Sequence, residues 1–104
     1  YEEVTLDGAT LGAVWIYCEA PDYHLVADDD EGFTCVDDVA RALVFYCRQY
    51  AADPAPEVLD KIRSMTEFLL FMQADNGYFY NFLLPGPKIN RTHQNSRAVA
   101  NWWS

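Results

Sequence analysis

The chain has 104 residues, 51% of them hydrophobic and 15% aromatic, with a formal net charge of −9, and this length bounds it to one small domain at most. No apolar run approaches the roughly 18 residues that span a bilayer, so we expect no membrane anchor. Residues 1–38 hold eleven Asp and Glu and no Lys or Arg, and the remainder has no Lys/Arg cluster, so we expect no nucleic-acid binding.

The first predicted element is a helix over residues 5–19. Leu6, Leu11, Val14 and Cys18 have mostly helical spacing, and Asp7 is a candidate cap. Pro21 ends this helix. The acidic residues 22–34, which follow, are predicted to form a loop.

Two helices are predicted next. Apolar residues recur at i, i+3, i+4, i+7 and i+8 from Val36 onward and predict a helix that ends near Ala52, before Asp53 and Pro54. A third helix begins at Pro56, whose missing N–H costs nothing in the first turn. The Asn-Gly pair at residues 76 and 77 is expected to end it.

The last third of the chain is rich in aromatic residues. Residues 77–90 alternate in a strand-like way, but Pro85, Gly86 and Pro87 interrupt the pattern, so we expect an extended loop. A final helix is predicted from Gln94 or Asn95 to the end of the chain. These elements define an all-α fold of helical hairpins.

The cysteines and histidines form no pattern typical of a metal or cofactor site. Cys18, Cys35 and Cys47 include no C-x-x-C pair, and both His24 and His93 are distant in sequence. A structural zinc site needs tighter spacing. We therefore expect no metal, no cofactor, and three buried, reduced thiols that serve as small apolar side chains.

The acidic residues 28–31 precede Gly32 and invite comparison with a calcium loop. With Gly32 at the sixth position of an EF-hand loop, Ala27 falls at the first, which requires a carboxylate, and Asp38 at the twelfth, where Glu is usual. The match fails. An acidic cleft would suit a neutral or cationic ligand, or a metal ion, and a solvated acidic face explains the charge about equally well.

Two adjacent carboxylates, Asp37 and Asp38, lie where the acidic segment meets the second helix. One of them is expected to be the N-cap, and Arg41 is spaced to pair with either. The second aspartate then needs another explanation, because neighbouring helical residues point about 100° apart. Glycosidases use carboxylates on both sides of the scissile bond, so this aspartate is a candidate for catalysis or for binding sugar hydroxyls.

A run of aromatic side chains beside an amide, Tyr78 to Phe82, is typical of sugar-binding surfaces, although rings such as Phe79 and Phe82 also pack between helices. Further on, Asn90 and Thr92 form an N-glycosylation sequon. No Ser-His-Asp arrangement, phosphate-binding glycine loop or dinucleotide motif is visible.

Three segments together resemble a known family. "GFTCVDDVARALV" (residues 32–44) is similar to a G-Y-x-x-D-D-N-A-R-A-L signature, "FLLFMQADNGYFYNF" (68–82) to F-L-x-x-A-Q-x-x-x-G-x-F-x-N-F, and "NSRAVANW" (95–102) to G-R-A-L-W-A-L. The signatures are those of bacterial (α/α) toroid domains related to six-hairpin glycosidases, including domains found beside glycosyltransferase modules. The resemblance covers residues 32–103.

The resemblance implies a fragment of an (α/α)6 toroid from a bacterial carbohydrate-active protein, in the cytoplasm or the periplasm, with a sugar-binding cleft at the ends of the inner helices. It implies two catalytic carboxylates, Asp37 and Asp38, at the mouth of an inner helix. The residues that it implies for oligosaccharide binding are Arg41, Tyr78, Asn81 and Arg97.

Two functions stay open. One is glycoside hydrolase-like action on an oligosaccharide, and the other is a non-catalytic helical module that binds glycan or protein. Residues 92–96 replace an acidic stretch of the family, which favours the second function. The chain starts at Tyr1 without a leader and its four predicted helices cannot close a ring of twelve, so we expect a fragment, or copies that associate through exposed hairpin faces.

Overall fold

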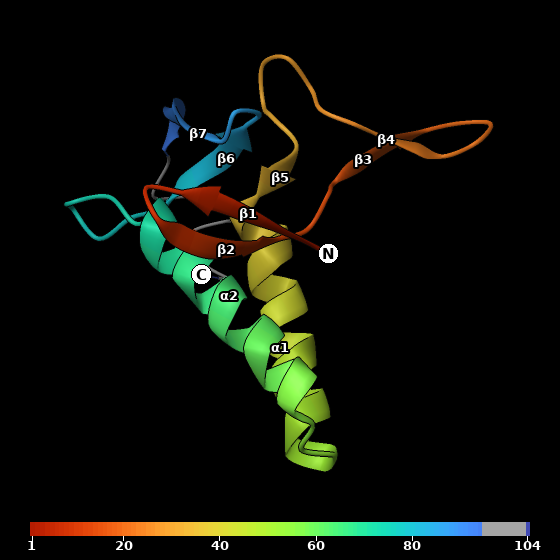
Figure 1. The fold of residues 1–104 in the computed structure, drawn as a ribbon. Helices are drawn as coiled ribbons and strands as arrows, with labels where there is room; N and C mark the ends of the chain where they lie inside the picture. The colour runs from red at the N-terminus through yellow and green to blue at the C-terminus, as the bar shows by residue number, and fades with distance from the viewer. Residues whose placement is uncertain (95–103) are drawn as a thin grey trace.

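The computed structural model describes residues 1–94 and 104, with residues 93 and 94 described by their backbone alone. Within these residues two helices accompany seven strands, which form three antiparallel sheets (Figure 1). The elements are β1 (Glu2–Leu6), β2 (Ala9–Ala13), β3 (Tyr17–Glu19), β4 (His24–Val26), β5 (Thr34–Cys35), α1 (Val36–Ala52), α2 (Pro56–Met72), β6 (Tyr80–Leu84) and β7 (Lys88–Gln94). The prediction of an all-α toroid fragment is therefore wrong, because the chain forms a small α+β domain.

The β1–β2 hairpin replaces the helix predicted over residues 5–19. Asp7 and Gly8 have positive φ angles of 49° and 80°, as the two central residues of a type I′ turn require. The residue that we expected to cap a helix therefore reverses the chain instead. Leu11 of β2 is fully buried against α2. Gly12 allows this close approach, because a Cβ there would lie 2.9 Å from the backbone nitrogen of Met65.

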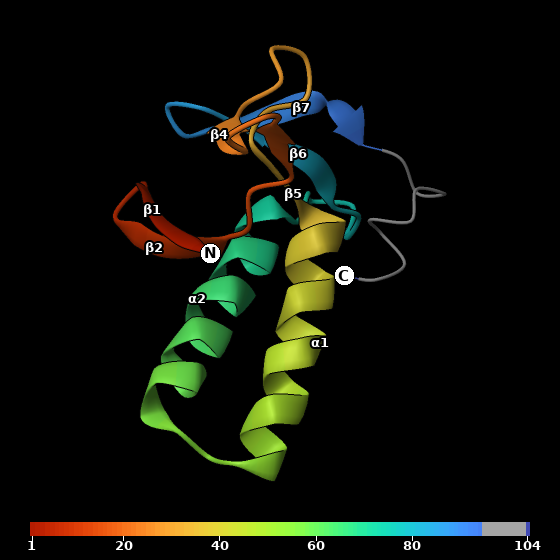
Figure 2. The ribbon, with the colours of Figure 1, turned by 90° about the vertical axis from the view of Figure 1, so that its right-hand side faces the viewer.

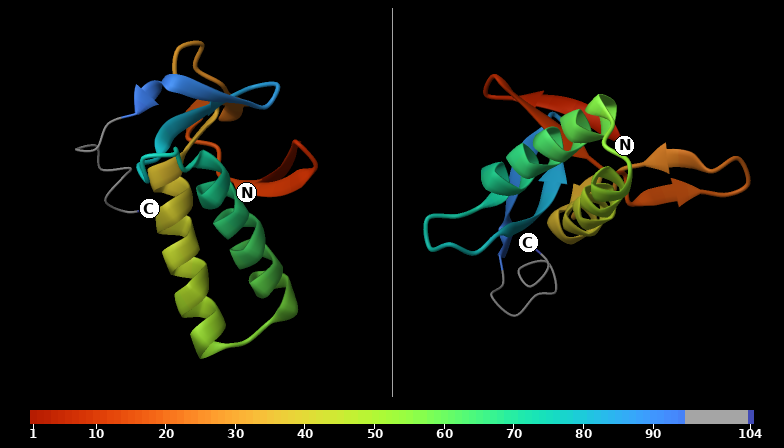
Figure 3. Two further views of the ribbon diagram at one scale, coloured as in Figure 1. Left: turned by 90° about the vertical axis from the view of Figure 1, so that its left-hand side faces the viewer. Right: turned by 90° about the horizontal axis from the view of Figure 1, so that it is seen from below.

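The β3–β4 hairpin projects away from the rest of the fold (Figures 1 and 3). Its strand residues are exposed except for Val26, which is half-buried. The predicted loop over residues 22–34 is therefore wrong where β4 lies, but its acidic part is a tight turn. In that turn Asp28 and Gly32 exchange backbone hydrogen bonds of 2.8 and 2.9 Å.

The α1–α2 hairpin agrees best with the sequence. α1 spans the predicted residues 36–52, and α2 begins at Pro56 as expected but ends at Met72, before the predicted Asn-Gly stop. The distal half of the hairpin extends beyond the sheets (Figure 2), so Val44 and Phe45 stay exposed although Val36 and Val39 are buried. Self-association through such faces stays a prediction.

The third sheet, β5–β6–β7, lies at the start of α1 and the end of α2, because β5 directly precedes α1 and β6 follows α2. Thr34 pairs with Leu83, and Leu83 with Ile89. The extended loop predicted over residues 77–90 is wrong, because the alternating residues form β6 and the Pro-Gly-Pro sequence makes the turn to β7. The predicted final helix lies outside the described residues, except that Gln94 belongs to β7.

The core fills the space between the helices, β1–β2 and the third sheet. Its largest fully buried side chains include Leu11, Met65, Phe68, Met72 and Leu83. Within the described part of the chain, neither helix is long and apolar enough to cross a membrane.

Candidate functional site

The two predicted catalytic aspartates lie in the first turn of α1. Its N-cap is Cys35, whose side chain makes no capping bond, so the expectation that one aspartate is the N-cap is wrong. The Cys35 thiol instead donates a hydrogen bond of 3.3 Å to Oδ2 of Asp38. Both carboxylates still lie where the helix dipole favours negative charge.

Arg41 pairs with both aspartates, as its spacing predicted. Its guanidinium lies 3.2 Å from Oδ2 of Asp37 and 3.8 Å from Oδ1 of Asp38. The Asp37 side chain is 23% exposed and that of Asp38 is 40% exposed. We call Cys35, Asp37, Asp38 and Arg41 the helix-start cluster.

The helix-start cluster does not suit a metal ion, although ligand atoms of Cys35, Asp37 and Asp38 lie within 4.8 Å of one another. Burial raises the pKa of the Cys35 thiol, and the nearby Asp37 and Asp38 carboxylates act in the same direction, so the thiol keeps the proton that it donates to Asp38. The Arg41 guanidinium already neutralises the two carboxylates. The cluster is therefore explained as the charged start of a helix.

The remaining predicted residues do not join this cluster in a common cavity. Tyr78 lies in the turn before β6 with its side chain 45% exposed. Asn81 lies on β6, and its buried side-chain oxygen accepts no hydrogen bond from the described residues. Arg97 lies outside the described residues. None of the predicted residues that are described, Asp37, Asp38, Arg41, Tyr78 and Asn81, lines any of the three cavities described below.

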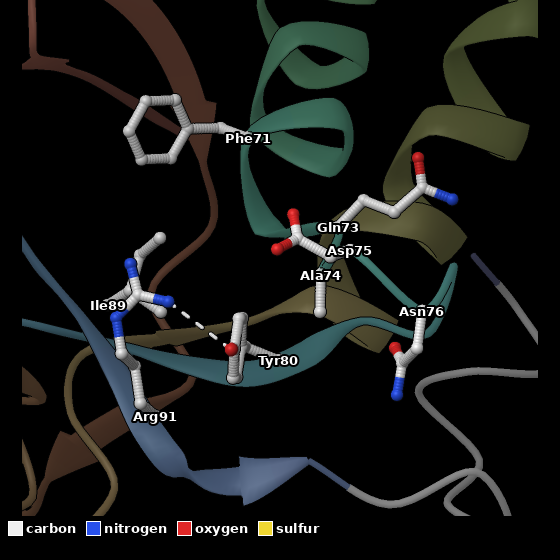
Figure 4. A pocket seen from close by; sticks show the side chains of 8 residues that line it. All are labelled: Phe71, Gln73, Ala74, Asp75, Asn76, Tyr80, Ile89 and Arg91. Atoms are coloured by element: carbon white, nitrogen blue, oxygen red, sulfur yellow. Dashed lines mark hydrogen bonds between the residues drawn. The ribbon is translucent and has the colours of Figure 1, made fainter.

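A cavity of about 370 Å³ lies between the end of α2 and the β6–β7 hairpin (Figure 4). We call it the Tyr80 cavity. Apolar and aromatic side chains from α2, β6 and β7 line it together with polar side chains from the turn after α2. The lining residues are Phe71, Gln73, Ala74, Asp75, Asn76, Tyr80, Ile89 and Arg91.

Arg91 and Tyr80 form a defined pair at this cavity (Figure 4). The Arg91 guanidinium donates a hydrogen bond of 3.2 Å to the Tyr80 hydroxyl, and its Cζ lies 5.1 Å from the ring centroid. The pairing of β6 with β7 brings the two side chains together, although the register shifts between Tyr80 and Phe82. A guanidinium that has both a ring contact and a hydrogen bond to one residue is restricted in its orientation.

The polar side of the Tyr80 cavity comes from a turn with its own hydrogen bonds. Ala74 and Gly77 are held by backbone bonds of 2.7 and 2.9 Å. The Gln73 amide donates to the Gly77 carbonyl at 3.1 Å, and Asn76 Oδ1 accepts from the Tyr78 backbone N–H at 3.1 Å. Asp75, between them, is the one carboxylate that the described residues place in the lining.

A second cavity, of about 570 Å³, adjoins the first and shares Phe71, Ile89 and Arg91 with it. Lys88 and Asp7 also line it, so the β1–β2 turn and β7 border the same hollow. A third cavity of about 290 Å³ lies along the β3–β4 hairpin, where the Tyr17 hydroxyl donates a hydrogen bond to Glu31. The larger two cavities make the β7 side of the domain the best candidate site.

The cysteines also differ from expectation. All three are free, as predicted. Only Cys35 is buried, however, whereas Cys18 and Cys47 are exposed. The prediction of three buried thiols is wrong for these two because the β3–β4 hairpin and the outer face of α1 have no packing neighbour among the described residues.

The predicted glycosylation sequon is inaccessible in the folded chain. Asn90 is 5% exposed, and its Nδ2 donates a hydrogen bond of 2.6 Å to the backbone oxygen of Asp30. Its Oδ1 accepts bonds from the backbone and hydroxyl of Thr92, at 3.2 and 2.6 Å. Asn90 therefore ties the acidic loop to β7 and leaves Arg91, the next residue, at the cavity.

Comparisons with protein families and with curated proteins identified no relative of this chain. No protein-family model matches the chain, and no curated protein matches it significantly. The resemblance to six-hairpin glycosidase domains therefore depends on the quoted motifs alone.

Proposed function

We propose that this chain binds carbohydrate, without cleaving it, in the Tyr80 cavity. The observation that carries the proposal is the two-sided lining of that cavity. Phe71, Tyr80 and Ile89 supply apolar and aromatic surface, while Asp75 supplies a carboxylate from the turn after α2. Sugars suit such a site, because their C–H faces pack on rings while their hydroxyls bond to amides and carboxylates.

The size of the hollow supports a small ligand. Small-molecule sites are typically about 300–1,000 Å³, and the Tyr80 cavity of about 370 Å³ adjoins a larger one. A short oligosaccharide could occupy the first cavity with one residue and extend along β7 toward the second.

The arrangement of carboxylates favours binding over hydrolysis. Glycosidases generally place two carboxyl groups across the scissile bond, whereas Asp75 is the one carboxylate among the described residues that lines the Tyr80 cavity. Asp37 and Asp38 are paired with Arg41 and line none of the described cavities. This supports the non-catalytic alternative and gives no support to the helix-start cluster as an acid/base pair.

The test is an NMR titration of the isotope-labelled chain with a panel of mono- to trisaccharides, with dissociation constants from the shifted resonances. We expect residues of the turn after α2 and of β7 to shift. Tyr80→Leu should weaken binding about tenfold, equivalent to about 1.4 kcal/mol, because it removes the ring and the partner of Arg91.

The matched control is Tyr23→Leu, which removes an exposed ring on the β3–β4 hairpin, 69% exposed and outside the Tyr80 cavity. It should leave the affinity unchanged. Thermal melts of both variants will show that the fold is retained. The proposal is overturned if no sugar shifts the cavity resonances, or if an oligosaccharide incubated with the chain is cleaved.

A further inference from the structure

We propose that the carbohydrate bound in the Tyr80 cavity is acidic, with its carboxylate or phosphate group held by Arg91. This inference rests on the proposed function, because it names the class of sugar that the same cavity takes. Three observations carry it: the partners of Arg91, the second cation beside it, and the position of Asp75.

Arg91 has no carboxylate partner of the kind that Arg41 and Arg63 have. Arg41 pairs with Asp37, and Arg63 lies 3.7 Å from Asp60. Among the described residues, by contrast, no carboxylate lies within the 4.0 Å ion-pair distance of Arg91, and its guanidinium bonds to the neutral Tyr80 hydroxyl. A guanidinium has five N–H donors, so one bond to a phenol leaves donors for a ligand at the cavity.

The Tyr80 contact also prepares Arg91 for this role. Carboxylates and phosphates are bound best by a guanidinium whose plane is fixed, because two parallel N–H groups can then meet two oxygens. The contact of the guanidinium with the Tyr80 ring, together with its hydrogen bond to the hydroxyl, limits the orientations that it can take.

The charged side chains around the cavity determine the orientation in which an acidic sugar binds. Lys88, on the same strand, borders the adjoining cavity with Arg91, so two cations lie along β7. Asp75 belongs to the turn after α2, which is a different element (Figure 4), and Asp7 lies at the β1–β2 turn. The acidic group of the sugar therefore binds at Arg91, and its hydroxyls face Asp75.

The experiment compares matched neutral and acidic probes by the same NMR titration. The pairs are galactotriose with trigalacturonate, and glucose with glucose 6-phosphate, with acetate and inorganic phosphate as probes of the anion alone. We expect the acidic member of at least one pair to bind about tenfold more tightly. Which pair shows the difference will distinguish a carboxylate from a phosphate.

Arg91→Gln should abolish the preference for the acidic sugar and leave the weak binding of the neutral sugar. Arg91→Lys, which keeps the charge but not the planar fork, should retain part of the preference. The matched control is Arg63→Gln, the same change on an exposed arginine of α2, and it should leave the preference intact at equal ionic strength.

The outcomes separate this inference from the function on which it rests. Equal binding of the neutral and acidic members, or a preference that survives Arg91→Gln, overturns the inference and leaves sugar binding in place. Binding of acetate or phosphate but of no sugar overturns both the acidic-sugar assignment and the proposed function. Absence of any binding also overturns both.

Discussion

The helix-start cluster and the Tyr80 cavity lie on the same small sheet but use an arginine in opposite ways. At the start of α1, Arg41 is neutralised by Asp37 and Asp38, which follow β5 directly. At β7, Arg91 contacts the neutral Tyr80 and borders two hollows. The first arrangement stabilises a helix, and the second leaves a charge available to a ligand.

The ion pairs with Arg41 give the acidic motif a structural explanation that needs no ligand. Adjacent aspartates with an arginine three and four residues later satisfy one another on the helix surface. Arg91, which lies beside a hollow and has no carboxylate partner among the described residues, is the basis of our proposal, and its position follows from the pairing of β6 with β7.

The largest expected effect concerns the sheet that carries both regions. Gly32 has φ of +120°, and a Cβ there would collide with the backbone of Leu83, 2.7 Å from its carbonyl carbon. Gly32→Ala should therefore separate the acidic loop from β6, where the Leu83 oxygen accepts a 3.1 Å bond from Phe33. We expect it to lower the free energy of unfolding in urea by about 2 kcal/mol more than a matched control.

That control is Gly86→Ala. Gly86 has a similar φ of +127°, but nothing lies within 4 Å of the position that a Cβ would take there, so the two variants share the backbone strain and differ in the collision. Equal losses of stability would show that the Leu83 contact is not tight. The contact between Gly32 and Leu83 would then not be what holds the acidic loop to β6.

The second prediction tests the helix-start cluster by pH. Burial raises the pKa of the Cys35 thiol, whereas a thiol in the unfolded chain titrates at about 8.5. Above that pH the unfolded chain binds fewer protons than the folded one, so stability should fall as pH rises from about 8.5 to 9.5. The slope from one thiol is at most about 1.4 kcal/mol per pH unit.

Tyrosines with raised pKa values act at higher pH, because their contribution begins near the ordinary tyrosine pKa of 10.0. Burial raises the pKa of Tyr1 to about 12, and the hydrogen bond to Glu31 raises the pKa of Tyr17 to about 12. Urea denaturation at several pH values between about 8.5 and 9.5 gives the slope of the free energy of unfolding against pH. This slope should be flatter for Cys35→Ala than for the unmodified chain, because the variant lacks the buried thiol. Cys47→Ala, which removes an exposed thiol, should keep the slope, and a flattening there would contradict the assignment.

The smallest expected effect comes from substitutions in the helix-start cluster, which should change stability without changing sugar binding at the Tyr80 cavity. Asp37→Asn and Asp38→Asn should each lower the free energy of unfolding by about 0.3–1 kcal/mol, because part-exposed ion pairs and first-turn charges contribute about that much. Asp37 should matter more, since it is less exposed and closer to Arg41. Neither change should alter sugar affinity in the NMR titration. A loss of sugar binding at unchanged stability would return these aspartates to a functional role.

Local pattern predicted the helices and missed the sheets. The apolar repeat from Val36 onward and the proline at residue 56 predicted α1 and the start of α2, because each of these signals is contained within a few neighbouring residues. The type I′ turn at Asp7 and Gly8 was detectable in principle, since Asp-Gly between apolar residues favours a hairpin. Helical spacing around that pair led to the wrong prediction.

Sequence reasoning placed some of the predicted site residues together and missed the pair that lines the proposed site. Asp37, Asp38 and Arg41 do come together, because their contacts depend on helical spacing alone. Tyr80 and Arg91 were not predicted, because the β6–β7 pairing and its register shift bring them together across an 11-residue separation. The alternation of residues 78–84, taken together with the Pro-Gly-Pro turn, was the signal that could have revealed this hairpin.

The far end of the α1–α2 hairpin offers a place to attach the protein. The connector, residues 53–55, lies at the opposite end of the helices from the three sheets (Figure 2), and the neighbouring Ala52 and Pro54 are exposed. Lengthening such a loop costs little, about 0.6 kcal/mol for each doubling. A fluorophore or a surface tether placed there would present the cavity to solution and leave the sheet that forms it untouched.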